Sequence, residues 1–192
     1  MSKRNNILFL ALFLLPFCLS AQTASYKVSG SSKMKITGSS NVHEWEENVN
    51  KTTGNASMDA SENFQIDQLV FKAEVTSIKS TKGSIMDNKT YEALKSDKHP
   101  YIIFELDKVL KASPVSGGYW LNTQGYLTIA GTKKLVKLDV KAILNSDGSI
   151  AFEGTKVFNM SEFGIDPPTA MMGSMKVGDE VKIQFKIYYN KY

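Results

Sequence analysis

The feature that most constrains this chain is a strict alternation of apolar and polar residues in several segments. In residues 136–144, Val, Leu and Ala occupy every second position, and Lys and Asp stand between the first four of them. The same period recurs in residues 33–37, 69–76 and 181–188. Because successive side chains of a β-strand point to opposite faces, each segment predicts a strand with one dry and one wet face, as in antiparallel sheets.

Turn-forming residues separate the alternating segments. Glycine, asparagine and aspartate gather in residues 117–118, 131–134 and 145–148, at the spacing of an all-β barrel or sandwich. We count about eight or nine strands, several of them eight to ten residues long, so the longest would reach about 30 Å. The pattern predicts an all-β fold, a tall antiparallel barrel of eight to nine strands.

One segment departs from the strand pattern. Residues near 87–95 have the composition of a short helix, and Ser84 or Asp87 could cap its start. Pro100 disfavours helical geometry at the residue before it, so the chain must extend there into another strand. Our hypothesis is that this helix covers or braces an opening of the barrel.

The chain begins with the layout of a secretory signal peptide. Lys3 and Arg4 precede an apolar run over residues 7–15, and the small residue Ala21 follows. We therefore expect residues 1–21 to be a signal peptide cleaved near Ala21, and the protein to be exported, that is, periplasmic or secreted.

Composition then limits what the remaining residues, 22–192, can do as a single predicted domain. Cys18 is the one cysteine of the chain, so the exported part has no disulfide and no thiol chemistry. Without Lys3 and Arg4, the 23 basic residues become 21, against 19 acidic ones. This balance gives no steering field for nucleic acid or for an anionic membrane, so we expect no nucleic-acid partner and at most transient membrane contact.

No residue pattern for catalysis, metal binding or a cofactor is found. His43 stands among glutamates, but in a strand Glu44 and Glu46 point away from it, so a metal site is not expected. No serine lies in a Gly-x-Ser-x-Gly turn, and no glycine-rich phosphate loop occurs. An enzyme acting on a bound lipid would need a titratable group facing the interior, and Lys156 is the one candidate by strand parity.

Five motifs in order resemble the YceI-like family of exported lipid-binding proteins. They are GSSNVHEW at 38–45, YEALKSDKHP at 91–100, GYLTIAGTKK at 125–134, MSEFGI at 160–165 and VGDEV at 177–181. The resemblance covers nearly the whole exported chain. It implies a lipocalin-like antiparallel barrel with an elongated pocket that binds isoprenoid chains or related amphiphiles, without catalytic residues.

On this resemblance, we expect non-enzymatic binding of an isoprenoid, an isoprenoid quinone or a fatty-acid type lipid, with no cofactor. Strand parity selects the side chains expected to face the ligand: Phe71, Val75, Phe104, Leu106, Leu127, Ile129, Leu138, Val140, Phe152, Phe158 and Phe185. Six others are expected at the rim or lid: Tyr91, Leu94, His43, Trp45, Met171 and Met172.

Two alternatives stay open at this point. The inward residues could form a filled core, which would make the protein an interaction or structural module of the cell envelope acting in stress. The methionines of residues 166–175 could serve adaptable apolar contacts or pack into the core. The sequence leaves the oligomeric state undetermined.

Overall fold

The computed structural model describes residues 23–61, 64–170 and 173–192. The predicted signal peptide and the predicted rim residues Met171 and Met172 lie outside the described residues. In the part of the chain that is described, no helix is long and apolar enough to cross a membrane.

Strands make up most of the described chain, together with one α-helix and two short 3-10 helices. In chain order they are β1 Ala24–Val28, β2 Lys33–Ser40, β3 Glu44–Val49, β4 Thr52–Asp59, β5 Gln65–Glu74, η1 Val75–Ser77, β6 Ile78–Ser80, α1 Ser84–Ala93, β7 Tyr101–Val115, β8 Gly118–Ile129, β9 Thr132–Leu144, β10 Ile150–Asn159, η2 Met160–Phe163, β11 Thr169–Ala170 and β12 Met175–Lys191.

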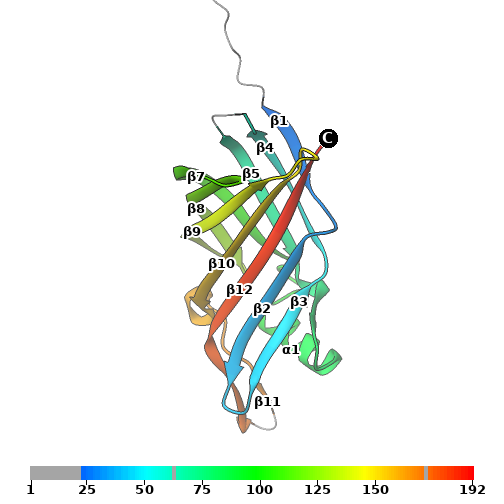
Figure 1. The fold of residues 1–192 in the computed structure, drawn as a ribbon. Coiled ribbons are helices and arrows are strands. Elements are labelled where there is room, and N and C mark those ends of the chain that lie inside the picture. The colour runs from blue at the N-terminus through cyan, green and yellow to red at the C-terminus, as the bar shows by residue number, and fades with distance from the viewer. Residues whose placement is uncertain (1–22, 62–63, 171–172) are drawn as a thin grey trace, which may run out of the picture.

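Eight antiparallel strands close into a barrel, which confirms the predicted fold class. The hydrogen-bonded order is β1-β4-β5-β7-β8-β9-β10-β12, and β12 pairs back to β1 (Figure 1). Closure pairs β1 with β12, two strands that would otherwise expose backbone groups at the edges of the sheet.

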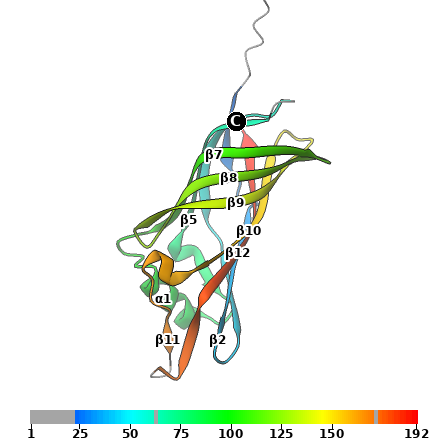
Figure 2. The same ribbon diagram turned by 90° about the vertical axis from the view of Figure 1, so that its left-hand side faces the viewer.

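The long strand β12 changes partner part-way along its length. From Val177 to Lys186 it pairs with β2, and from Tyr189 to Lys191 it pairs with β1. The sheet therefore continues past the barrel through β2, β3 and β6, and these strands extend the wall at one end. Figure 2 shows β7, β8 and β9 crossing the other strands at a steep angle.

Several strands exceed the eight to ten residues expected from the alternation. β7 has 15 residues, β9 has 13 and β12 has 17. β7 keeps its pairing with β8 over this length because its register shifts between Leu106 and Lys108, and again between Val109 and Lys111. Such bulges bend a strand without ending it.

The turn from β8 to β9 is tighter than the sequence indicated. It consists of two residues, Ala130 and Gly131, with φ of 47° and 85°. Positive φ at both central positions is the geometry of a two-residue hairpin that matches the twist of its strands. A Cβ at Gly131 would lie 2.6 Å from His99 Cε1, so only glycine allows the imidazole of His99 to pack here.

The helix α1 is present but begins three residues before the predicted start. The predicted cap was wrong: Gly83 occupies the N-cap position, and no side chain caps the helix. Asp87 is used differently, because its carboxylate accepts a 2.7 Å hydrogen bond from the Ser80 amide and pairs with Lys79 Nζ at 3.1 Å. These contacts attach the helix to β6.

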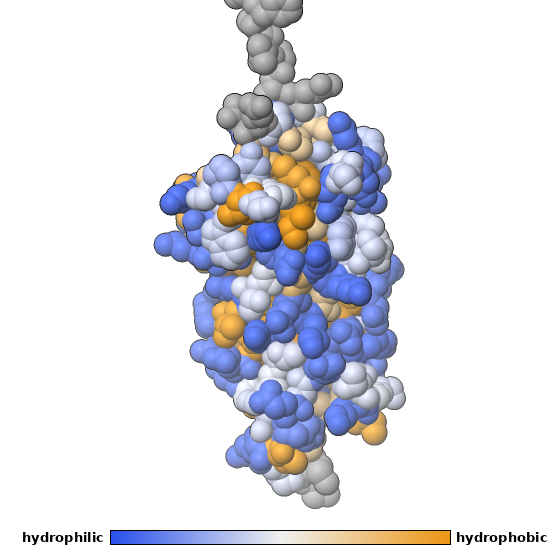
Figure 3. All heavy atoms as spheres, in the orientation of Figure 1, coloured by the Kyte–Doolittle hydropathy of each residue, from blue (hydrophilic) through white to orange (hydrophobic). Residues whose placement is uncertain are grey.

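The barrel is apolar inside and largely polar outside, as the alternation requires. The buried apolar side chains form one contiguous core, with Tyr189, Phe163 and Met58 among the largest. The outer face in Figure 3 is mostly hydrophilic, with an apolar patch near its upper end. Burial of the inner faces supplies the main driving force for folding, since residues 23–192 contain no cysteine that could form a disulfide.

Candidate functional site

The interior of the barrel is not completely filled. A main cavity offers about 110 Å³ to the centres of water-sized molecules, within about 990 Å³ of unfilled space that includes its openings. A second cavity lies beneath α1. It offers about 90 Å³ to the centres of water-sized molecules, within about 730 Å³ of unfilled space that includes its openings.

The two cavities are stacked along the barrel. On β12, the second cavity is lined by Val177, Val181 and Ile183, and the main cavity by Ile183 and every second residue after it as far as Tyr189. The long strand thus runs past both. Three isoleucines line both cavities and form the partition between them: Ile36, Ile102 and Ile183.

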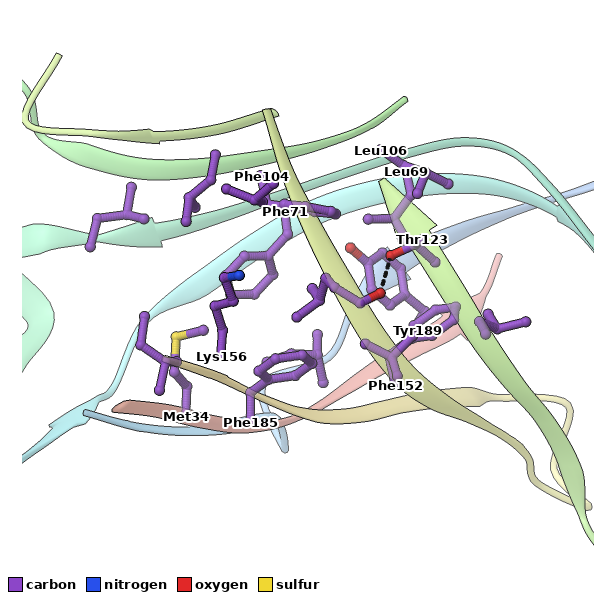
Figure 4. Close-up of a pocket in the computed structure, with 18 of the residues that line it drawn as sticks. Met34, Leu69, Phe71, Phe104, Leu106, Thr123, Phe152, Lys156, Phe185 and Tyr189 are labelled. Carbon is purple, nitrogen blue, oxygen red and sulfur yellow. Dashed lines mark hydrogen bonds between the residues drawn. The ribbon is translucent and has the colours of Figure 1, made fainter. Parts of the chain in front are cut away.

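The main cavity is almost entirely apolar (Figure 4). Its described lining residues are Met34, Ile36, Ile66, Leu69, Phe71, Ile102, Phe104, Leu106, Leu121, Thr123, Leu127, Val136, Leu138, Val140, Phe152, Lys156, Ile183, Phe185, Ile187 and Tyr189.

Three of the described residues that line the main cavity have polar side chains. The Thr123 hydroxyl donates to the Leu138 carbonyl at 2.6 Å, and the Tyr189 hydroxyl donates to the Val70 carbonyl at 3.2 Å. Burial raises the pKa of Tyr189, which keeps the phenol neutral. The third is Lys156, which Figure 4 shows pointing into the cavity from β10.

Eight of the eleven predicted ligand-facing residues line the main cavity: Phe71, Phe104, Leu106, Leu127, Leu138, Val140, Phe152 and Phe185. Ile129 and Phe158 line the second cavity instead, because they lie one layer further along β8 and β10. Val75 is buried but lines neither cavity, since β5 ends at Glu74 and Val75 begins the turn η1. Whether these residues bind a ligand stays a prediction.

The second cavity lies between α1 and the lower strands. Met86, Lys89, Thr90, Ala93 and Leu94 line it from the helix side. Figures 1 and 2 show α1 beside the lower part of the barrel. This placement agrees with the hypothesis that the helix covers an opening.

The predicted rim residues separate into two groups. Leu94 and Trp45 line the second cavity, and Trp45 donates from Nε1 to the Ser39 carbonyl at 3.0 Å. Tyr91 lines neither of these two cavities: its hydroxyl donates to the Ile78 carbonyl at 2.9 Å and fastens the helix to β6. His43 is exposed, in the turn between β2 and β3.

One buried carboxyl group lines the second cavity and was not predicted. Glu47 is 4% exposed, and its Oε1 accepts a 2.6 Å hydrogen bond from the Thr90 hydroxyl. Burial raises the pKa of Glu47, as does the charge of Asp87, while the Thr90 hydrogen bond lowers it. Strand parity could have found this residue, because Glu47 shares a face with Trp45 in β3.

The described residues contain no group of three or more His, Cys, Asp or Glu side chains placed to hold a metal ion. The open volume of the interior is lined almost entirely by apolar side chains.

Comparison with known proteins agrees with this architecture. The family model of the YceI-like domain matches residues 22–189. The chain belongs to the YceI-like family. A search of curated proteins found no match.

Solved structures show the same fold at low sequence identity. Burkholderia cenocepacia BcnA is 19% identical, with a TM-score of 0.65 over 82% of this chain and 95% of that one. A polyisoprenoid binding domain from Saccharophagus degradans, implicated in plant cell wall breakdown, is 9% identical, with a TM-score of 0.68 over 89% and 100%. The Campylobacter jejuni YCEI protein is 21% identical, with a TM-score of 0.57 over 76% and 84%.

Proposed function

We propose that this YceI-like protein binds the apolar chain of an amphiphile, of isoprenoid, isoprenoid quinone or fatty-acid type, inside its barrel. The observation that carries the proposal is the pair of stacked apolar cavities in a closed barrel. The polyisoprenoid binding domain from Saccharophagus degradans, which shares the fold, supports the choice of an isoprenoid.

The physical basis is transfer of the chain out of water. Each methylene buried in the main cavity contributes about 0.8 kcal/mol, so about ten of them supply roughly 8 kcal/mol before the cost of ordering the chain. The lining offers few competing polar groups, because the hydroxyls of Thr123 and Tyr189 already bond to backbone carbonyls.

The proposed role is binding without catalysis. Lys156 does face the main cavity, as an enzyme acting on a bound lipid would require. Among the described residues, however, it forms no ion pair with a carboxylate that could act with it as an acid or base.

The direct test is lipid extraction from protein purified from its native host without detergent, followed by mass spectrometry. We expect an isoprenoid or acyl lipid at near-stoichiometric amount. Absence of any lipid, together with no thermal shift on adding isoprenoid quinones or fatty acids, would refute the proposal.

A second test separates a binding cavity from a filled core. Leu138→Trp places an indole in the main cavity, so the free energy of unfolding should change by less than about 1 kcal/mol while lipid binding is lost. A filled barrel would lose about 1–3 kcal/mol by overpacking. Leu135→Trp is the matched control, because Leu135 is 52% exposed on the same strand, and this variant should keep its lipid.

Export is part of the proposal. The protein should be recovered from the periplasm or the medium, with a mature N-terminus near residue 22. Recovery of the full-length chain from the cytoplasm would contradict it.

A further inference from the structure

The wall of the barrel contains a seam between β9 and β10. These strands pair from Ile150 opposite Leu144 to Gly154 opposite Val140. Beyond that point, within the described residues, β9 stays paired only with β8, and β10 only with β12. Two strand edges, residues 132–139 and 155–159, therefore face each other without a hydrogen-bonded ladder, and Figure 2 shows β9 and β10 diverging.

Gly154 stands where the two strands separate. A Cβ at this position would lie 2.9 Å from Phe185 Cζ and 3.1 Å from the Asp139 carbonyl oxygen. The close approach of Phe185 and β9 thus depends on the missing side chain. The seam begins at the residue directly after this contact.

The side chain of Lys156 reaches across the seam. It starts on β10, lines the main cavity, and donates from Nζ to the Lys137 carbonyl of β9 at 3.2 Å. Among the described residues that line the main cavity, Lys156 is the one cation. Neighbouring lysines of β9, such as Lys133 and Lys137, are exposed.

The ammonium of Lys156 has hydrogen-bonding capacity left. An ammonium carries three N–H donors, and the structure shows one acceptor for it, the Lys137 carbonyl. The six ion pairs among the described residues do not include Lys156. A charge beside an apolar cavity without a counter-ion favours a ligand that supplies one.

We propose that Lys156 anchors an anionic head group, a carboxylate or a phosphate, of the amphiphile at the β9–β10 seam. This inference rests on the proposed function, since the tail of that amphiphile occupies the main cavity. The head group then lies at the side wall of the barrel, where the strands leave room, and not at its lower end beneath α1. Lys156 becomes the residue that selects acids over alcohols of equal chain length.

Two matched ligand pairs test this directly: hexadecanoic acid with hexadecanol, and geranylgeranyl phosphate with geranylgeraniol. Dissociation constants come from displacement of a fluorescent apolar probe from the full exported chain. Since charge-assisted hydrogen bonds are the strong ones, wild type should prefer the anionic member of at least one pair by about tenfold or more. The pair that shows the preference identifies the head as carboxylate or phosphate.

Three variants isolate the anchoring residue. Lys156→Met should abolish the preference and leave alcohol affinity within about threefold, because the apolar part of the side chain is retained. Lys156→Arg should keep the preference, since it keeps the charge. Lys137→Met is the matched control: it removes an exposed lysine of the same seam and should also keep the preference.

The outcomes separate this inference from the proposed function. Equal affinity of wild type for acid and alcohol, or a preference that survives in Lys156→Met, overturns the anchor while lipid binding stands. Failure of wild type to bind any of the four ligands overturns the anchor. It overturns the proposed function as well only if lipid extraction and the thermal-shift assay with isoprenoid quinones also find no ligand. Circular dichroism and thermal melting of each variant show that a lost preference does not reflect misfolding.

Discussion

Shortening Ile102 to alanine should join the two cavities of the barrel. Ile102 lines both of them, together with Ile36 and Ile183. Along β12, the main cavity extends from Ile183 to Tyr189 and the second from Val177 to Ile183. Each stretch spans seven residues, and the six steps between them cover about 20 Å of strand at roughly 3.3 Å per residue. Opening the partition should therefore nearly double the length available to an apolar chain.

The cost in stability should be moderate. Replacing a buried isoleucine by alanine typically costs about 2–5 kcal/mol, and the cost increases with the volume of the new void. Because Ile102 already borders two cavities, fewer side chains pack against it, and we expect about 2 kcal/mol. For a protein of this size, that lowers Tm by roughly 4–8 °C.

Ile78→Ala is the matched control. Ile78 is 0% exposed and lines neither cavity, so its truncation should cost about 4 kcal/mol and leave ligand length unaffected. The comparison holds the chemistry of the substitution fixed and changes only its position relative to the partition.

The assay is affinity against chain length, in a series of saturated fatty acids from about 12 to about 22 carbons, where each buried methylene contributes about 0.8 kcal/mol. In wild type, affinity should stop rising once the main cavity is full. In Ile102→Ala the rise should continue for several more carbons. If Ile102→Ala still folds and binds, but its affinity stops rising at the same chain length as in wild type, the idea that Ile102 separates the two cavities is refuted.

Three further predictions concern the helix end of the barrel. Because the folded-state pKa of Glu47 is raised, the contribution of this residue to the free energy of unfolding is fully present below pH 4.5. That contribution is lost as the pH rises through the folded-state pKa. Glu47→Gln should remove this decrease, measured by denaturant unfolding across pH. The pKa of Asp87 is lowered, chiefly by the Ser80 amide, so stability decreases as pH falls below 3.8. Asp87→Asn should remove that acid loss and cost roughly 1–2 kcal/mol at neutral pH. A Cβ at Gly38 would lie 2.4 Å from Trp45 Cζ2, so Gly38→Val should displace the indole and shift its fluorescence.

Each of these has a control. Glu46→Gln changes a partly exposed glutamate next to Glu47 and should leave the decrease above pH 4.5 in place. If the free energy of unfolding of Glu47→Gln decreases equally above pH 4.5, groups other than Glu47 cause the decrease. Asp97→Asn, at an exposed position after the helix, should keep the acid loss. The fluorescence test is made in a Trp120→Phe background, which leaves Trp45 as the one tryptophan, and an unshifted spectrum there would contradict the clash.

The alternation in the sequence determined the barrel and most of its inner surface. In β9, Val136, Leu138 and Val140 line the main cavity as parity predicts, because a long strand with lysines between its apolar residues has one stable orientation. Lys156 obeys the same rule on β10. Parity works in these strands because no turn interrupts them near the cavity.

Strand parity gave a wrong prediction where the backbone forms hydrogen bonds outside the strand ladder. Val75 continues the alternation of β5 in the sequence, but its amide donates to the Pro100 carbonyl, and Ser77 Oγ donates to the carbonyl of Glu74. These bonds form the turn η1 in place of further strand. The start of α1 was equally hidden, since Gly83 offers no side chain that marks a cap.

By itself, then, the sequence determined that this chain forms an antiparallel barrel with an apolar interior, because residue period is a local property. The tertiary structure alone decided how that interior is divided. Ile36 and Ile183 lie side by side because β2 pairs with β12, and Ile102 joins them in lining both cavities from β7, which is not a neighbour of β12 in the sheet. The seam at Lys156 exists only because β10 leaves β9 after Gly154. Both depend on which strands become neighbours, which residue period does not specify.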